Sequence, residues 1–443
     1  MVHLPEKNIF SGIPQSLIIG ATGDIEKAKK WLQEKKATEK IRSNYEDFVS
    51  VFTDGSNVVS ERRGCGVAIF SSISIKYKRD NSGEEIVNFF QINPQDTILI
   101  ILPKYYVSSR ANTIMRGLEY ITAYNLIDDD ITFFVFDGSY VTSLIEPRAS
   151  IRDLYTELIR IAKSLKPVKY NEIIFEIIGI MEEKLYRRMQ SIFSVESDKI
   201  YKEFFAHYYT LFEETYNEIE NTIDKSVLSA ISGYLQNYLF LFIEQNFVLS
   251  ALKLLLDTLQ RKNIPAIWIS KDAEGRHLTR ELKAISLSND LALLDFILGN
   301  REFLPVSKLV NLSEIEPDRV TIYEAKEVDN VGKVYATFQE FAETLYEDYR
   351  KYEIVYAKLG GPVIQLSYPK KIVNIETLKD ILGKLLTISK FGYPQPLVYV
   401  HNRSLLRERM IKQLAEGIYK FCEKSSSGFL CNLLKRSGRD LFL

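Results

Sequence analysis

The stretch Val51-Phe52-Thr53-Asp54-Gly55-Ser56 has a similar second copy in Phe134-Val135-Phe136-Asp137-Gly138-Ser139, with the same Asp-Gly-Ser ending. In each copy a short apolar run brings one carboxylate to a glycine, which is the pattern of a buried strand ending at a turn. Glu119 lies between the two copies, on a segment with helical spacing of its apolar residues. One Asp-Gly-Ser after a strand is commonly only a turn. Two copies with a helical glutamate between them indicate one shared site.

The residues around the two copies predict a domain of mixed helices and strands, of the α/β (α+β) class. Apolar runs and alternation predict a helix over 108–126 and strands over 48–53, 64–71, 73–78, 98–102 and 131–136. The strands 64–71 and 73–78 are expected to form an antiparallel pair. This β-β-β-α-β order, with carboxylates closing the first and last strands, predicts an RNase H-like mixed sheet flanked by helices.

The middle of the chain has a different pattern. Residues 150–262 repeat apolar side chains every three or four positions, with few glycines and a single proline, which predicts a large all-helical insertion. The division of the chain is therefore an N-terminal arm (1–46), a first half-domain (47–149), the insertion (150–262), a second half-domain (263–420) and a C-terminal tail (421–443). The second half-domain is expected to include a strand over 265–270, a strand-like run over 394–400, and a basic helix over 403–419.

Composition sets the broad class. The 443 residues are 46% hydrophobic and 26% charged with a net charge of −1, so any nucleic-acid surface must be local. The three cysteines, an odd number without zinc spacing, favour a reducing cytoplasm. The start of the chain has no signal-peptide pattern. The most apolar region, 227–259, is interrupted by residues such as Glu244 and Lys253, which favours a buried helix and no membrane association.

Carboxylates at adjacent strand ends and on a neighbouring helix can converge on one point. Asp54, Glu119 and Asp137 supply the oxygen ligands that Mg²⁺ and Mn²⁺ prefer. Two such ions about 4 Å apart can activate a water and stabilise the leaving oxygen of a phosphodiester. The glycine after each aspartate is expected to turn the backbone away, so that a substrate can come close. The pattern predicts a metal-dependent nuclease.

Other side chains can join this centre. His401, at the end of the run 394–400, can complete the metal shell or carry a proton, although a lone histidine is more often structural. Lys271 directly follows the strand 265–270, where its ammonium group can contact a scissile phosphate. Surface cations usually only keep a protein soluble, but four arginines can flank the same opening: Arg110, Arg116, Arg276 and Arg280.

The chain resembles the NurA nuclease family of archaea and some bacteria. The matching segments, in order, are Phe52-Thr53-Asp54-Gly55-Ser56, Arg116-Gly117-Leu118-Glu119, Phe136-Asp137-Gly138-Ser139, Ile269-Ser270-Lys271-Asp272, Asp290 with Leu293-Leu294 and Gly299, and Gly392-Tyr393-Pro394-Gln395-Pro396-Leu397 ahead of His401. Their order and spacing cover residues 45–410 apart from the insertion. Two departures are Val400, where members usually have alanine, and the segment 365–369, which lacks an acidic residue before its proline.

The resemblance implies an RNase H-like fold and a nuclease dependent on Mn²⁺ or Mg²⁺, with two ions. It implies single-stranded endonuclease activity and 5′-to-3′ exonuclease activity on single- and double-stranded DNA. It also implies a homodimer that works with a HerA-type hexameric ATPase in DNA-end resection, for double-strand break repair by homologous recombination. By position, the metal ligands would be Asp54, Glu119, Asp137 and His401, with Lys271 and Tyr399 nearby.

Two other interpretations stay open. The chain can be a non-catalytic DNA-clamp or adaptor subunit of the translocase, in which the carboxylates serve only as turns. It can also be an RNase H-like nuclease that acts on RNA or RNA–DNA hybrids through the same metal site. The presence of all four candidate ligands favours a nuclease over an adaptor, and the residues alone do not separate DNA from RNA as the substrate.

Overall fold

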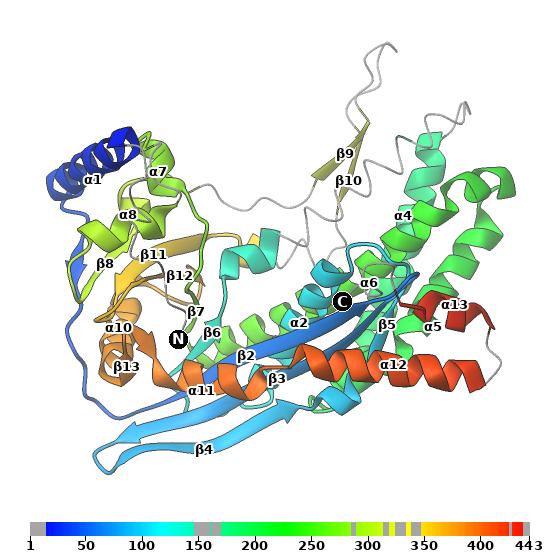
Figure 1. Cartoon of the computed structure of the whole chain (residues 1–443), viewed down its shortest axis with the longest axis horizontal. Coiled ribbons are helices and arrows are strands. Elements are labelled where there is room, and N and C mark those ends of the chain that lie inside the picture. Colours follow the sequence, from blue (N-terminus) through cyan, green and yellow to red (C-terminus); the bar gives the residue numbers. More distant parts are fainter. Residues whose placement is uncertain are drawn as a thin grey trace, which may run out of the picture.

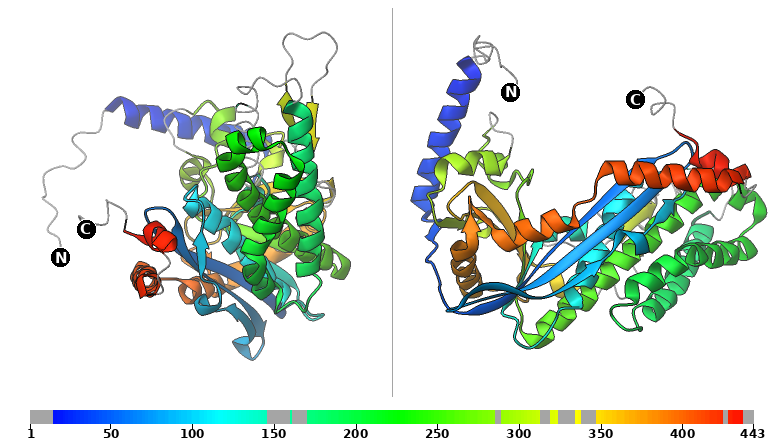
Figure 2. Two further views of the ribbon diagram at one scale, coloured as in Figure 1. Left: turned by 90° about the vertical axis from the view of Figure 1, so that its right-hand side faces the viewer. Right: turned by 60° about the horizontal axis from the view of Figure 1, so that its bottom comes forward.

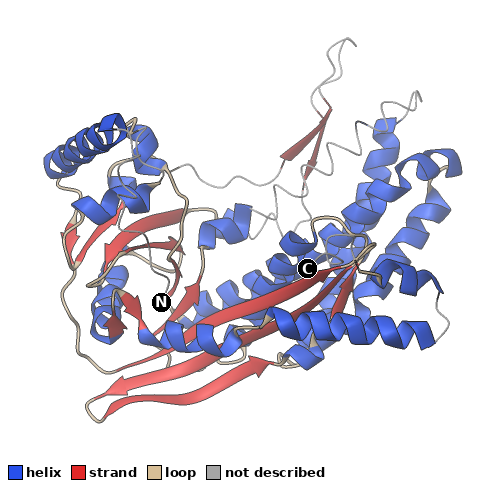
Figure 3. Ribbon diagram, in the orientation of Figure 1, coloured by secondary structure: helices blue, strands red, loops and turns tan. Residues whose placement is uncertain are grey.

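The computed structural model of this chain describes residues 15–145, 160, 170–284, 289–312, 319–323, 334–337, 347–424 and 428–436. A long twisted sheet runs through the molecule, and helices lie on both of its faces (Figures 1 and 2). Figure 3 shows the same arrangement with the strands in red and the helices in blue.

One ten-stranded sheet organises the described residues. Its order is β1-β8-β11-β12-β7-β6-β2-β3-β4, and β5 adds to β3. The strands are β1 (Glu39–Lys40), β2 (Phe48–Glu61), β3 (Gly66–Asp80), β4 (Gly83–Ile92), β5 (Leu99–Ile101), β6 (Phe133–Asp137), β7 (Ala266–Ser270), β8 (Glu302–Pro305), β11 (Tyr352–Lys358) and β12 (Val363–Pro369). The strands β2, β6 and β7 are parallel, whereas β2-β3 and β3-β4 are antiparallel. The order β4-β3-β2-β6-β7 confirms the predicted RNase H-like mixed sheet.

Two hydrophobic cores cover the two faces of the sheet. The helices α2 (Val107–Tyr124) and α6 (Lys225–Lys262) pack on one face, and α10 (Ile375–Ile388) and α11 (Gln395–Ser404) lie on the other. Because successive side chains of a strand alternate between faces, Val51 joins the core under α2 and Phe52 joins the core under α11. This alternation decides which face each functional side chain can reach.

The predicted all-helical insertion contains three helices in its described part. They are α4 (Tyr170–Ile192), α5 (Ile200–Thr222) and α6, while most of 146–169 lies outside the described residues. Because α6 leads directly into β7, the parallel connection from β6 to β7 passes through this bundle. By length and composition α6 could cross a membrane, but 83% of its apolar window is buried in the fold. The expectation of a buried helix is confirmed.

Three strand predictions are wrong in detail. The expected pair 64–71 and 73–78 is one strand, β3, whose antiparallel partners are β2 and β4. The serines in the middle of β3 form hydrogen bonds inside the fold: Ser74 Oγ lies 2.7 Å from Thr53 Oγ1, and Ser72 Oγ lies 2.9 Å from Thr122 Oγ1. The strand β2 does not end before Asp54, since it pairs with β3 as far as Glu61. The strand β4 was not predicted.

The segment 394–400, predicted to be strand-like, begins the helix α11. Prolines at its start fit a helix, because the first turn needs no backbone N–H donors. The buried residues Pro396, Leu397, Val400 and Ser404 recur at helical spacing on one side. The basic helix predicted over 403–419 is displaced, since α11 ends at Ser404 and a new helix, α12 (Glu408–Lys424), begins after a short break.

The remaining elements complete the periphery. The helix α1 (Gln15–Lys35) packs beside α8 (Asp290–Ile297), and the short strand β1 ties the N-terminal arm to the sheet. The others are α7 (His277–Glu281), α13 (Gly428–Leu434), two 3-10 turns (Pro94–Asp96 and Val306–Lys308), and two small antiparallel pairs, β9 (Arg319–Tyr323) with β10 (Val334–Thr337) and β13 (Ser389–Lys390) with β14 (Tyr393–Pro394).

Candidate metal centre

The two aspartates lie side by side because β2 and β6 are neighbouring parallel strands. Thr53 pairs with Phe136, so Asp54 and Asp137 stand one position further along the two strands. Alternation along the strands turns both carboxylates toward the face that carries Phe52 and α11. Asp54 is buried and Asp137 is partly exposed, which leaves the pair open on one side.

His401 meets this pair from α11. Its Nδ1 lies 2.8 Å from Asp54 Oδ2, across a sequence separation of 347 residues. One ligand atom from each of Asp54, Asp137 and His401 lies within 4.8 Å of the others. Two carboxylates and an imidazole make a donor set that suits Mn²⁺. The residues therefore fit a divalent metal ion, and the structure groups three of the four predicted ligands.

Glu119 approaches from the opposite face of the sheet, on α2. It is buried beside Gly55, where an added Cβ would lie 2.9 Å from Glu119 Oε1 and 2.5 Å from Met115 Sδ. The glycine therefore leaves room for the glutamate within a continuous strand, and the predicted turn at Gly55 is wrong. Glu119 is not part of the group whose ligand atoms all lie within 4.8 Å of one another, but the charge of Asp54 still acts on its carboxylate.

Burial, together with repulsion between neighbouring carboxylates, raises the pKa values of Asp54 and Glu119. Burial, followed by the negative charge of Asp137, raises the pKa of Asp54 to about 6, although the hydrogen bond to His401 opposes the shift. Burial and the charge of Asp54 raise the pKa of Glu119 well above its usual value, while Arg116 acts against that shift. Buried carboxylates that repel one another in this way present the charge that a divalent cation would neutralise.

Lys271 and Tyr393 adjoin the partly exposed side of the centre. Lys271 Nζ lies 3.3 Å from Asp137 Oδ2 and 4.3 Å from the centroid of the Tyr393 ring. Burial and the charge of Asp137 raise the pKa of Tyr393, so the phenol stays protonated. Its hydroxyl has no hydrogen-bond partner of normal geometry among the described residues, which leaves it able to donate to a ligand. No role was predicted for Tyr393, and its only signal was its place in the segment 392–397, which resembles the NurA family.

The predicted nucleic-acid contacts divide into two groups. The prediction that Arg110 contacts nucleic acid is wrong, because only 1% of the residue is exposed and its guanidinium pairs with the fully buried Glu244, 2.8 Å away. This ion pair joins α2 to α6 and cannot reach a substrate. Arg276 is exposed at the start of α7, and Arg116 is half-buried beside Glu119. Neither position contradicts the predicted contact with nucleic acid. Tyr399 is 41% exposed on α11, and the Arg403 guanidinium lies over its ring.

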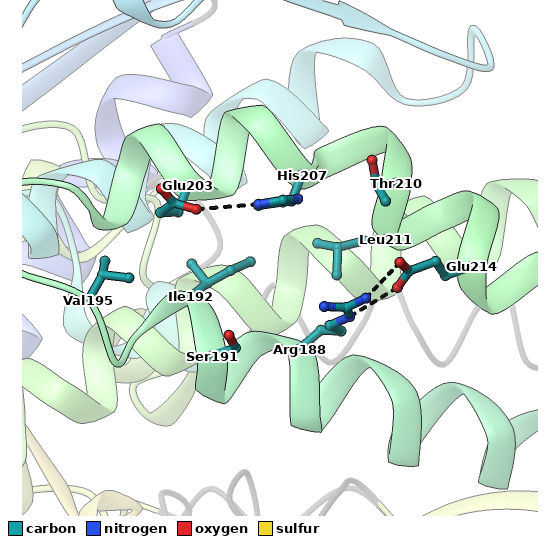
Figure 4. A pocket seen from close by; sticks show the side chains of 9 residues that line it. All are labelled: Arg188, Ser191, Ile192, Val195, Glu203, His207, Thr210, Leu211 and Glu214. Atoms are coloured by element: carbon teal, nitrogen blue, oxygen red, sulfur yellow. Dashed lines mark hydrogen bonds and ion pairs between the residues drawn. The ribbon is translucent and has the colours of Figure 1, made fainter.

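Charged residues also gather in the helical bundle, in a pocket between α4 and α5 (Figure 4). There Arg188 Nη2 lies 2.7 Å from Glu214 Oε1, and His207 Nε2 lies 3.3 Å from Glu203 Oε2. These charges pair with each other across or along the two helices. Within the described residues, the grouping that could hold a metal ion is the one at Asp54, Asp137 and His401.

Comparison with known proteins agrees with this geometry. The family model described as the NurA domain matches residues 49–404. The structure of the NurA nuclease from Sulfolobus solfataricus is 15% identical, covers 93% of this chain and 95% of its own, and has a TM-score of 0.51. A structure of NurA with manganese is 13% identical, with 88% and 92% coverage and a TM-score of 0.51. An uncharacterized protein of Methanocaldococcus jannaschii is 21% identical over 366 residues, 77% of this chain and 78% of that protein.

Proposed function

This chain belongs to the NurA family, and from that premise we propose that it is a metal-dependent nuclease that hydrolyses DNA phosphodiester bonds. The observation that carries the proposal is the convergence of Asp54, Asp137 and His401, whose ligand atoms lie within 4.8 Å of one another. The similar NurA structure described with manganese supports the choice of metal. Mn²⁺ is the proposed ion, with Mg²⁺ as a substitute and two ions at work.

The side chains divide the work by position. Asp54, Asp137 and His401 would hold the metal, with Glu119 adding charge from behind. Bound there, a divalent ion supplies positive charge for the phosphate and lowers the pKa of a water. Lys271, at the partly exposed side, would contact a non-bridging phosphate oxygen, and the Tyr393 hydroxyl, close to Asp137, would donate to the same group. These donors would orient the scissile phosphate against the carboxylate pair.

We propose the modes of cleavage, the partner and the pathway on the basis of family resemblance alone. We assign to the chain single-stranded endonuclease activity and 5′-to-3′ exonuclease activity on single- and double-stranded DNA. We also assign a homodimer in the cytoplasm that works with a HerA-type hexameric ATPase in DNA-end resection and homologous recombination. Net charge does not oppose this, because a near-neutral protein can still place its cations along one DNA path.

Digestion of end-labelled DNA with Mn²⁺ tests the proposal. Asp137→Ala removes one ligand from the group of three and should slow hydrolysis at least about 100-fold, since even changes to outer-shell partners of metal ligands cost about 10- to 100-fold. Asp129→Ala is the matched control, because that carboxylate is 94% exposed and pairs with Lys262 away from the centre. The control should digest DNA at the wild-type rate.

The same assay separates the other interpretations. Wild-type protein that binds DNA and stimulates a partner ATPase, but digests nothing with Mn²⁺, would establish an adaptor. Faster digestion of matched RNA or hybrid strands than of DNA would establish an RNase H-like enzyme for those substrates. Wild-type rates in a clean preparation of Asp137→Ala would refute the assignment of the metal centre.

A further inference from the structure

The turn between β13 and β14 exposes a phenylalanine almost completely. Phe391 is 93% exposed, more than any other large apolar side chain in the described part of the protein. A phenylalanine placed in water forgoes the burial that normally stabilises an aromatic side chain. Packing within this chain therefore does not explain why a phenylalanine stands at this position.

Backbone conformation does not explain it either. Phe391 and Gly392 have positive φ angles of 53° and 83°, which is the pattern of a tight two-residue hairpin turn with both central residues left-handed. Asparagine, aspartate and glycine suit such a position, whereas a bulky side chain is strained there. The turn thus carries a residue that is unfavourable both for its conformation and for its exposure.

The turn is held in place by a second turn. Gly361, between β11 and β12, lies so close that an added Cβ would be 2.2 Å from the Phe391 carbonyl oxygen. An added Cβ on Gly392 would likewise be 2.6 Å from Gly361 Cα. Two backbones pack directly against each other here because both partners are glycines. The backbone under Phe391 is therefore supported on one side, while its ring projects into solvent.

The position of the turn connects it to the metal centre. Phe391 is two residues before Tyr393, so the Cα atoms of Phe391 and Tyr393 are at most about 7 Å apart. The ring of Tyr393 lies under the Lys271 ammonium group. Lys271 in turn contacts Asp137. Tyr399, the other exposed aromatic in this part of the chain, is two residues before His401. Figure 1 shows β13 next to the beginning of α11, the helix that carries His401.

We propose that Phe391 is a base-stacking residue, whose ring takes the face of an unpaired nucleobase beside the scissile phosphate. Aromatic side chains stack on every base, because each base offers a flat π-face, and they do so with little sequence preference. A base in a duplex is already stacked on its neighbours, so the ring selects single-stranded or unwound DNA. This inference rests on the proposed nuclease function and names the form of the substrate that the same centre takes.

Binding of a labelled single-stranded thymidine oligonucleotide in metal-free buffer tests the role of the ring without hydrolysis. Phe391→Asn removes the ring and suits the left-handed turn, so the variant should fold at least as well as the wild type. We expect its affinity to fall about 10-fold, within the range for loss of one stacked base. Phe391→Tyr should restore binding. Phe429→Ala should not change it, since Phe429 is 78% exposed on the distant α13.

An oligonucleotide with one abasic position identifies the base as the partner. The abasic position is moved along the strand in a series of oligonucleotides. At one location it should weaken binding by the wild type as much as Phe391→Asn does, and at that location it should not weaken binding by the variant any further. Wild-type affinity of Phe391→Asn, or an equal loss at every abasic location, would overturn the proposal. A smaller particle in size-exclusion chromatography of Phe391→Asn would assign the ring to contact with a second copy and overturn it too. Failure of the nuclease function itself is read separately, from Mn²⁺-dependent digestion by the wild type.

Discussion

Asp54-Gly55-Ser56 and Asp137-Gly138-Ser139 share three residues and differ in structure. The first copy lies inside β2, which pairs with β3 on both sides of it. The second ends β6, where Gly138 has a φ of 117° and the chain turns away. An added Cβ at Gly55 would collide with Glu119, whereas at Gly138 it would meet nothing within 4 Å.

The comparison shows that one tripeptide serves two purposes. In both copies the aspartate is fixed by its parallel strand, so the carboxylates meet whatever the backbone does next. The glycine of the first copy accommodates a neighbouring helix, and the glycine of the second permits a conformation. Each purpose predicts a different response to the same substitution.

The largest effect is expected from adding a methyl group at the two glycines. Gly55→Ala should displace Glu119 and lower Mn²⁺-dependent digestion about 100-fold, the loss that a misplacement of about 1 Å can cause. Gly138→Ala should instead destabilise the fold by about 1–3 kcal/mol through backbone strain, with a smaller loss of activity. Digestion rates and urea unfolding of both variants measure the difference. If Gly138→Ala lost more activity than Gly55→Ala, the two roles would be reversed.

An intermediate effect is expected from Glu119. This residue packs against Gly55 of the first copy, and no described side chain takes the same place at Gly138 of the second. Because burial and the charge of Asp54 raise its pKa in the folded protein, ionised Glu119 destabilises the fold at neutral pH. Glu119→Gln should therefore raise the melting temperature of metal-free protein by about 2 °C, corresponding to about 1 kcal/mol. The variant should also gain less stability from Mn²⁺ than the wild type does.

The sign of the pH dependence follows from the same shift. As the pH falls through the raised pKa, wild-type Glu119 takes up a proton and the advantage of Glu119→Gln should shrink. Asp54, with its pKa raised from 3.8 to about 6, should stabilise both proteins as the pH falls through that window. Thermal melts of both proteins between about pH 8 and pH 5 measure this. An advantage that grows toward pH 5 would contradict the account.

The smallest effect is expected from the two serines. Ser56 Oγ accepts a hydrogen bond from the Leu406 N–H at 3.2 Å, and Ser139 Oγ accepts one from Thr142 N–H at 3.3 Å. Loss of either should cost about 1 kcal/mol or less. Only Ser56→Ala loosens the segment that follows α11, so it alone should weaken the binding of Mn²⁺, measured by titration calorimetry. Equal affinities in both variants would show that the Ser56 contact is only structural.

Local patterns predicted the mixed sheet, the strands that carry Asp54 and Asp137, and the helix that carries Glu119, because short-range alternation and helical spacing mark each of these elements. They did not predict that β2 continues beyond Asp54, since that depends on pairing with β3, and Gly-Ser-Asn alone is typical of a turn. The burial of Arg110 depends on Glu244, 134 residues away. The helix α11 was mistaken for a strand because its apolar run is short, and short runs suit either structure.

His401 closes the metal centre from a position far beyond both aspartates, and this has a consequence for protein synthesis. A chain elongated only as far as β14 contains both carboxylates and the whole sheet, yet lacks the third ligand and the helix that covers them. Proteins fold from the N-terminus as they leave the ribosome. Premature termination or proteolytic cleavage directly after β14 would therefore yield a sheet without its third ligand, so the proposed activity depends on translation beyond His401.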